Sequence, residues 1–212
     1  MKWRYFKGQS SERLRLFYLG WGMDDHVFEH LLEPCAVDTL LVWDYTDIST
    51  PLPLKDRPLE VIAWSMGVWA ASQTVRHDNL FSATAINGTP YPIDDKRGIP
   101  EAIFEGTLAT LSESGLARFR RRMCNGAAGM TAFLQHAPQR SVEDLRDELA
   151  ALGQAIRARP AVAFPWTRAI GCTGDKIFPL SAQQAAWPQL EICEGGHWDA
   201  ALFESILKGT LE

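Results

Sequence analysis

The chain has 212 residues and a formal net charge of −5 at pH 7, with 46% hydrophobic and 22% charged residues. This length fits a single domain, residues 1–212, with a substantial buried core, and the composition is typical of globular proteins. The net negative charge gives no reason to expect a nucleic-acid partner, and no apolar run approaches the ~20 residues that cross a bilayer.

In chain order, the apolar runs and their spacing predict a strand at 14–19, a helix at about 25–33, strands at 38–44 and 59–64, a helix at about 67–77, a strand at 82–87, several short helices between about 100 and 160, strands at 168–174 and 190–193, and a helix at about 199–208. Strands that alternate with helices favour a mostly parallel sheet with helices on both faces. The helical stretch interrupts this alternation in the way that an inserted helical cap does. The predicted fold class is therefore α/β.

The N-terminal residues and the cysteines indicate the compartment. Residues 1–6 lack the apolar stretch and the small-residue cleavage site of a signal peptide. The four cysteines are spaced singly, which is typical of small buried apolar residues rather than of a disulfide framework or a zinc site: Cys35, Cys124, Cys172 and Cys193. We expect a cytoplasmic protein.

The segment Val-Ile-Ala-Trp-Ser-Met-Gly, residues 61–67, predicts a sharp turn between a strand and a helix, with Ser65 at its tip. A serine at such a turn has a strained backbone and exposes its hydroxyl at the carboxyl end of the strand. Small residues two before and two after the serine, here Ala63 and Gly67, keep the two backbones from colliding. Short matches of this kind also occur by chance, so the segment alone is no proof of a nucleophile.

A serine hydroxyl needs a base to take its proton and an acid to orient that base. Asp175 follows one predicted strand and His197 another, and the order serine, aspartate, histidine is typical of a serine on a strand-to-helix turn in a parallel sheet. In such sheets the carboxyl ends of the strands form the ligand site. Other acids remain open at this stage: Asp44, Asp47 and Asp199.

Two backbone amides are candidates for an oxyanion site. The amide of Met66 follows the predicted nucleophile, and the turn Gly20-Trp21-Gly22 follows the first predicted strand, so that the Trp21 amide is the expected second donor. The Trp21 side chain is alternatively a plain core residue.

Four arginines cluster in the predicted cap: Arg118, Arg120, Arg121 and Arg122. A charge run is usually a solvated surface, and acidic residues at 143–148 balance the later part of this segment. Over an active site, such arginines can instead steer an acidic carrier protein.

A second motif indicates a different chemistry. His26-Val-Phe-Glu-His30 matches an inverted zinc-protease motif with both histidines on one helical face. We set it aside, because five-residue matches are common and no further acidic ligand stands out, and we expect a solvated helix face with no metal. The chain has no Walker or GxGxxG loop, which gives no nucleotide site.

Several segments together resemble the BioG-type enzymes of the α/β-hydrolase fold: residues 17–24, 62–68, 86–92 and 98–107. The resemblance covers most of the chain. It implies a pimeloyl-[acyl-carrier protein] methyl ester esterase of biotin synthesis that needs no cofactor. It also implies catalysis by Ser65, Asp175 and His197, an oxyanion site with Trp21, and a carrier protein that docks on Arg118, Arg121 and Arg122. The alternatives are a hydrolase of small free esters or thioesters and a non-catalytic binding module.

Overall fold

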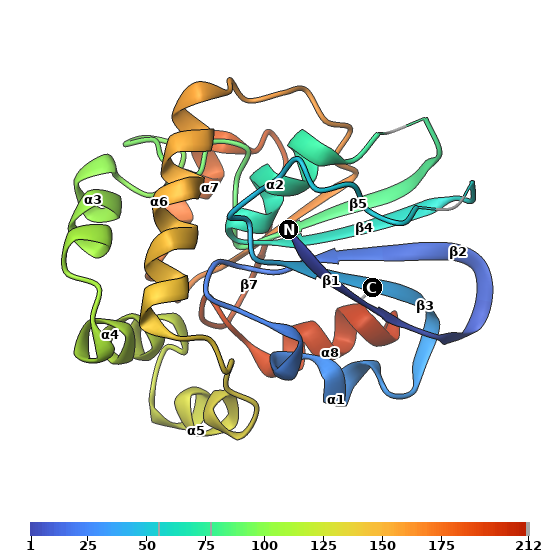
Figure 1. Ribbon diagram of the computed structural model, residues 1–212, viewed down its shortest axis with the longest axis horizontal. Helices are drawn as coiled ribbons and strands as arrows, with labels where there is room; N and C mark the ends of the chain where they lie inside the picture. Colours follow the sequence, from blue (N-terminus) through green and yellow to red (C-terminus); the bar gives the residue numbers. More distant parts are fainter. Residues whose placement is uncertain (55, 77, 211–212) are drawn as a thin grey trace.

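A computed structural model describes residues 1–54, 56–76 and 78–210. Within them the chain forms a seven-stranded sheet in the order β1-β3-β2-β4-β5-β6-β7 (Figure 1). β1 pairs antiparallel with β3, and all other neighbours pair in parallel. The strands are β1 (Lys2–Phe6), β2 (Gly8–Tyr18), β3 (Cys35–Trp43), β4 (Leu59–Trp64), β5 (Leu80–Ile86), β6 (Arg168–Cys172) and β7 (Glu191–Cys193).

Helices cover both faces of the sheet, as predicted. α1 and α8 lie on one face and α2 lies on the other (Figure 1). The helices are α1 (Glu29–Leu32), α2 (Met66–Thr74), α3 (Glu101–Ala109), α4 (Glu113–Met123), α5 (Ala127–Gln135), α6 (Val142–Ala158), α7 (Leu180–Ala186) and α8 (Ala200–Lys208).

The sequence pattern missed or misjudged several elements. β1 was not predicted, because most of its residues are exposed on an edge strand and show no apolar run. The predicted strand at 14–19 covers only the apolar part of β2, which begins at Gly8. The start was missed because the first residues of β2 are mostly polar. The helix predicted at about 25–33 is wrong: the chain makes a short 3-10 turn, Asp25–Val27, and only four residues of α1. α7 was also not predicted.

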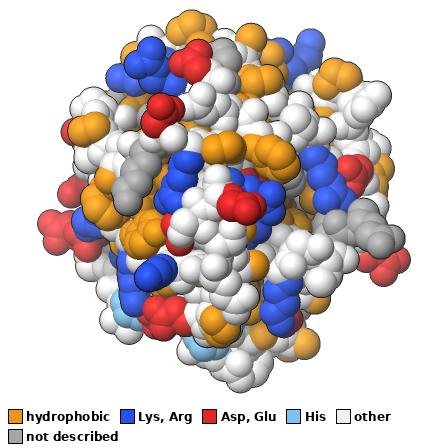
Figure 2. Space-filling model, turned by 90° about the vertical axis from the view of Figure 1, so that its right-hand side faces the viewer, with side chains coloured by type: hydrophobic (Ala, Val, Ile, Leu, Met, Phe, Trp, Pro, Cys, Tyr) orange, Lys and Arg blue, Asp and Glu red, His pale blue; other side chains and the backbone are white. Residues whose placement is uncertain are grey.

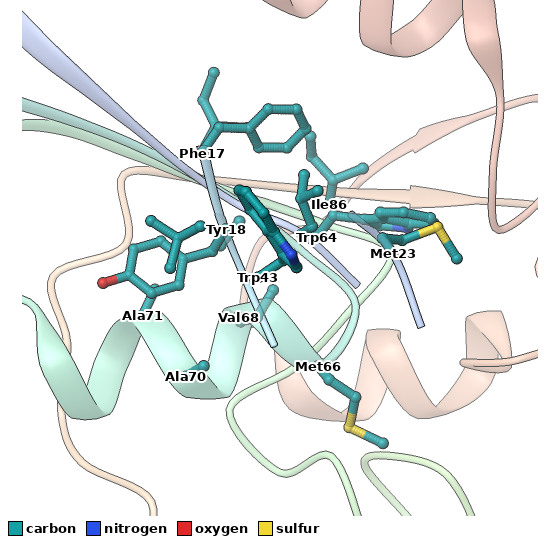
Figure 3. Close-up of a cluster of buried hydrophobic side chains, with 14 of the residues drawn as sticks. Phe17, Tyr18, Met23, Trp43, Trp64, Met66, Val68, Ala70, Ala71 and Ile86 are labelled. Carbon is teal, nitrogen blue, oxygen red and sulfur yellow. The ribbon is translucent and has the colours of Figure 1, made fainter. Parts of the chain in front are cut away.

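The core lies between the sheet and its helices. The largest fully buried side chains include Trp64, Trp69 and Phe17. Figure 3 shows side chains from β2, β4, β5 and α2 gathered in one apolar cluster, among them Tyr18 and Val68. Every residue from Leu16 to Leu19 is fully buried, which is typical of a central parallel strand covered on both faces. This packing holds the carboxyl ends of β2 and β4 rigidly side by side.

The segment α3–α6 lies beyond the carboxyl ends of the strands (Figure 1). Several short helices were predicted here, but α6 is a single long helix of 17 residues. The Ser141 hydroxyl caps it by accepting a hydrogen bond from the Asp144 amide. Glu148 of α6 is fully buried, where it pairs with Arg140 and accepts a hydrogen bond from the Tyr45 amide. The acidic run at 143–148 is therefore not simply a solvated face, because one of its carboxylates ties α6 to the loop after β3.

The opposite side of the molecule, to the right in Figure 1, has a mixed surface. Acidic, basic and apolar side chains are interspersed on it (Figure 2). None of the described helices has the length and apolar character needed to span a membrane.

Candidate active site

Ser65 occupies the turn between β4 and α2 with φ 61° and ψ −128°. Residues other than glycine rarely adopt this backbone conformation. Its surroundings show why small residues are needed. A Cβ atom on Gly67 would lie 2.6 Å from the Leu19 carbonyl oxygen, and one on Gly88 would lie 2.4 Å from the Ser65 carbonyl oxygen. Ala63 is fully buried. The close approach of three backbone segments presents the serine at the end of β4.

The structure brings together the three residues that the sequence singled out. His197 Nε2 lies 2.9 Å from Ser65 Oγ, and His197 Nδ1 lies 2.9 Å from an Asp175 carboxylate oxygen. All three residues are buried. Low solvent exposure strengthens hydrogen bonds between ionisable groups, so this chain of contacts is suited to moving a proton from the serine to the imidazole.

The other candidate acids have different partners. Asp44 accepts a hydrogen bond from the Thr46 hydroxyl and forms an ion pair with Arg140. Asp47 accepts hydrogen bonds from Ser49. Asp199 caps α8. Asp175 is therefore the acid that contacts the His197 ring among these four.

Asp175 is itself held by several donors. Its Oδ1 accepts hydrogen bonds from the Ile177 and Phe178 amides, at 2.8 and 2.9 Å, and its Oδ2 faces His197. Gln183, a fully buried residue of α7, donates to the same Oδ2 at 3.2 Å and to the Phe178 carbonyl. The sequence reasoning missed Gln183 because it missed α7, and a lone glutamine carries no motif.

Two further side chains anchor the loop that carries His197. Asn87 Nδ2 donates to the carbonyl oxygens of Gly196 and His197, each at 3.0 Å, and Asn87 Oδ1 accepts from the Cys172 amide. Trp64 Nε1 donates to the His197 carbonyl at 2.9 Å. Asn87 has a positive φ of 46° and is fully buried at the end of β5. A polar residue directly after an apolar strand was the signal that could have identified it.

The two expected oxyanion donors lie on either side of the serine turn. Met66 is the first residue of α2, and the first amides of a helix have no partner within the helix. A Cβ on Gly20 would lie 3.1 Å from Ser65 Cβ, so the turn that contains Trp21 packs directly against the serine. The Trp21 side chain is buried and donates to the Leu145 carbonyl of α6 at 2.9 Å. The indole thus belongs to the core, while the Trp21 amide remains a candidate donor.

A mostly apolar pocket opens over Ser65. It is lined by Gly20, Trp21, Trp64, Ser65, Met66, Ile99, Ile103, Phe104, Thr107, Phe119, Arg122, Met123, Leu149, Ile177 and His197. The free volume is about 40 Å³, enough for a few water molecules at most. Side chains of α3, α4 and α6 form part of its wall.

The four arginines of α4 are not equivalent. Arg122 lines the pocket and donates to the Lys176 carbonyl at 2.8 Å. Arg118 and Arg122 line a groove between α3 and α4 that adjoins the pocket, and Arg121 is exposed. The Arg120 guanidinium lies 5.8 Å from the Phe133 ring, and burial lowers its pKa. Arg120 therefore belongs to the contact between α4 and α5.

The histidines of the inverted zinc motif do not share a helical face, and this expectation is wrong. His26 lies in the 3-10 turn, where its Nδ1 is 3.3 Å from Asp24 Oδ1. The His30 ring stacks on His136, with ring centroids 3.6 Å apart. Asp24, Asp25 and His26 offer potential ligand atoms within 4.8 Å of one another, but Asp24 also accepts a hydrogen bond from the Gln139 amide. The two histidines serve different contacts.

Comparisons with known proteins agree with this architecture. The family model of the pimeloyl-ACP methyl esterase BioG matches residues 1–206. A malonyl-[acyl-carrier protein] O-methyltransferase of Bacteroides fragilis is 46% identical over 204 residues; the match covers 92% of this chain but only 41% of that protein. This chain thus spans about two fifths of that relative's length.

Solved structures show the same fold. The crystal structure of BioG from Haemophilus influenzae is 34% identical, with a TM-score of 0.88 over 98% of this chain and 100% of that one. A lipase-esterase related protein of Clostridium acetobutylicum is 14% identical, with a TM-score of 0.64 over 99% of both chains. The predicted α/β-hydrolase fold is confirmed, and it indicates an enzyme of hydrolase type. By sequence and by structure, this chain belongs to the BioG family.

Proposed function

We propose that this chain is a serine carboxylesterase that hydrolyses the methyl ester of pimeloyl-[acyl-carrier protein] in biotin synthesis. The observation that carries the proposal is the buried contact chain Ser65–His197–Asp175, with 2.9 Å at each step, at the base of an apolar pocket. Membership of the BioG family supports the choice of substrate.

The first half of the reaction transfers the acyl group to the enzyme. His197 Nε2 takes the hydroxyl proton while Ser65 Oγ attacks the ester carbonyl carbon. Asp175 keeps the proton on His197 Nδ1 and stabilises the imidazolium that forms. His197 then returns the proton to the methoxy oxygen, so that methanol leaves and the pimeloyl chain stays bound to Ser65 as an ester.

The second half releases the product. A water molecule replaces methanol, gives a proton to His197 and attacks the acyl-enzyme carbonyl, which frees the pimeloyl carboxylate and restores the Ser65 hydroxyl. In both tetrahedral intermediates the amides of Met66 and Trp21 donate hydrogen bonds to the oxyanion. One such donor contributes about 3–4 kcal/mol to transition-state stabilisation.

The segment α3–α6 lies within the proposed cap, at about residues 100–160 of a single domain. It provides the binding site for the acyl chain of the substrate. The apolar side chains of the pocket suit the methylene groups between the two carboxyl ends of the substrate. The free volume over Ser65 is only about 40 Å³, and the groove between α3 and α4 adjoins it. We therefore expect an acyl chain to enter along this groove, with the side chains of α3 and α4 moving apart to admit it.

Arg118, Arg121 and Arg122 are the proposed docking site of the carrier protein. Arg118 and Arg122 line the groove, and Arg121 is exposed on the same helix. Cationic side chains at this place attract an acidic partner and accelerate its association. A carrier bound there would feed its acyl chain through the groove toward Ser65.

The B. fragilis relative is named for the O-methylation of malonyl-[acyl-carrier protein]. That name fits the present proposal, because an esterase of this kind removes a methyl group of the same type. About three fifths of that relative lie outside the match.

The decisive experiment is hydrolysis of pimeloyl-[acyl-carrier protein] methyl ester and of a p-nitrophenyl ester by purified protein. Ser65→Ala should lower kcat by at least about 10³-fold on both substrates. Ser72→Ala is the matched control, since Ser72 is a buried serine of α2 that donates to the Trp69 carbonyl, and it should retain activity. Full activity of Ser65→Ala would overturn the proposal.

Two further measurements separate the alternative functions. The double variant Arg118→Glu/Arg121→Glu should have a higher KM than the wild type for the carrier-bound ester, while its p-nitrophenyl ester hydrolysis stays the same. If the variant and the wild type have the same KM for the carrier-bound ester, a hydrolase of small free esters is favoured. A fluorophosphonate probe should label Ser65, and a wild-type protein that stays unlabelled would favour a non-catalytic module. Complementation of a biotin auxotroph that lacks its methyl ester esterase tests the pathway directly.

A further inference from the structure

Two cysteines that are 21 residues apart in the sequence lie side by side near the candidate active site. Cys172 ends β6 and Cys193 ends β7, and they are register partners in the parallel pair. Their sulfur atoms are 3.1 Å apart, and both residues are free cysteines. The spacing in the sequence gave no hint of this pair, because only the sheet brings the two strands together.

We propose that Cys172 and Cys193 form a redox-reactive dithiol, which a low-molecular-weight disulfide such as glutathione disulfide converts reversibly into an intramolecular disulfide. The disulfide would lower the reactivity of Ser65, and this part of the inference rests on the proposed function.

The backbone permits the bond. Neighbouring strands lie about 4.7–4.9 Å apart, and disulfides join Cα atoms about 4.4–6.8 Å apart. Register partners at the ends of β6 and β7 therefore have a separation that a disulfide can span. The sulfur atoms have to approach by about 1 Å, from 3.1 Å to ~2.05 Å.

The two thiols have different roles in the exchange. Cys193 is half-buried and within reach of a small reagent, whereas Cys172 is completely buried. The hydrogen bond from the Cys172 thiol lowers the pKa of Cys193, and the same hydrogen bond, together with burial, raises the pKa of Cys172. Cys193 is therefore the attacking thiolate, since exchange depends on the thiolate form.

The reaction proceeds in two balanced steps. The Cys193 thiolate attacks one sulfur of glutathione disulfide, which forms a mixed disulfide and releases one glutathione thiolate. Cys172 then loses its proton, attacks Cys193 Sγ and displaces the second glutathione. Overall, two protein thiols are oxidised by two electrons, one disulfide is reduced to two thiols, and the two protons end on glutathione.

Hydrogen bonds connect Cys172 to Asp175 and to Asn87, which holds the His197 loop. Asn87 Nδ2 lies 3.3 Å from Cys172 Sγ and donates to the carbonyls of Gly196 and His197. The Asp175 amide donates to the Cys172 carbonyl at 3.2 Å. A Cys172 sulfur that moves toward Cys193 leaves its place beside Asn87, and the Asn87 amide group, which also holds the His197 loop, would shift with it.

The first test identifies the bond. The protein is incubated with glutathione disulfide, free thiols are alkylated under denaturing conditions, and the chain is digested with trypsin without reduction. Cleavage after Arg168, Lys176 and Lys208 should give peptide 169–176 linked to peptide 177–208, with Cys35 and Cys124 alkylated. Dithiothreitol should separate the two peptides, and Cys193→Ser should prevent the link.

The second test measures the consequence. The rate of fluorophosphonate labelling of Ser65 should fall by about 10- to 100-fold after oxidation, because a misplacement of ~1 Å can cost 10²-fold, and dithiothreitol should restore it. Cys193→Ser should label at the wild-type rate with or without the oxidant.

Three outcomes distinguish the dithiol itself, its effect on Ser65 and the proposed function. If no linked peptide forms under an oxidising glutathione ratio, the dithiol proposal is overturned. If the link forms completely and the labelling rate is unchanged, its control of Ser65 is overturned. If the reduced wild type itself is not labelled, the proposed function fails, while the linked peptide still decides whether the redox site exists.

Discussion

Asp175→Asn is the sharpest test of how the candidate active site works. Asp175 Oδ1 accepts hydrogen bonds from the backbone amides of Ile177 and Phe178. An asparagine at this position has to place its amide oxygen there, because an NH₂ group would face two donors. Oδ2 faces a single, longer donor besides the imidazole, Gln183 Nε2 at 3.2 Å. The two backbone donors at Oδ1 therefore favour the oxygen there, and the new NH₂ group takes the place of Oδ2 and points at His197 Nδ1.

This orientation reverses the hydrogen bond to the imidazole. Asp175 Oδ2 accepts from His197 Nδ1 at 2.9 Å in the wild type, whereas the NH₂ group of asparagine donates. His197 Nδ1 then becomes the acceptor and Nε2 carries the proton, so Nε2 can no longer take the proton of Ser65. The corresponding substitution in serine proteases lowers kcat by about 10⁴-fold, which equals about 5.5 kcal/mol in the activation barrier.

The assay is the steady-state hydrolysis of a p-nitrophenyl ester at pH 7.5, with far-UV circular dichroism to verify folding. We expect kcat to fall by about 10⁴-fold while KM changes little. The matched control is Asp199→Asn, because Asp199 caps α8 and asparagine is an equally good cap. A loss of less than tenfold for Asp175→Asn, or an equal loss for Asp199→Asn, would refute this reasoning.

Three predictions concern stability and protonation. Gly67→Ala should lower the free energy of unfolding by at least about 1–3 kcal/mol in urea denaturation, since its Cβ would lie 2.6 Å from a backbone oxygen. Arg140→Met should cost about 3–5 kcal/mol by the same measurement, because it strands the buried carboxylate of Glu148. Partial desolvation and the neighbouring His136 lower the pKa of His30 below its usual 6.5. As pH falls through 6.5 the unfolded chain binds more protons than the folded chain, so the free energy of unfolding should decline. An NMR titration should show that His136→Gln raises the His30 pKa.

Each of these has a matched control or a refuting result. Gly106→Ala should stabilise the protein by up to about 1 kcal/mol, as a Cβ there meets no atom within 4 Å; equal losses at both glycines would contradict the steric argument. Glu148→Gln keeps an acceptor for the Tyr45 amide and should cost less than Arg140→Met. A His30 pKa at or above 6.5 would disprove the stated pH dependence.

The sequence by itself determined the class of fold and the place of the serine. Alternating apolar runs and helical segments leave a parallel sheet as the way to bury both faces of each strand. The turn around Ser65 was readable because its requirement falls on nearby positions in the sequence, Ala63 and Gly67. A Cβ on Gly67 would lie 2.6 Å from the Leu19 carbonyl oxygen. Asp175 and His197 could be proposed because each follows a strand in the same sheet.

The tertiary structure decided the contacts that no local pattern encodes. Gln183 reaches Asp175 from α7, Asn87 reaches the His197 loop from β5, and Cys172 meets Cys193 across two strands. In the sequence these are single polar or sulfur-containing residues without a motif. Their roles arise because the sheet places strand ends from distant parts of the chain at one edge, where a hydrogen bond depends on distance in space rather than on spacing along the chain.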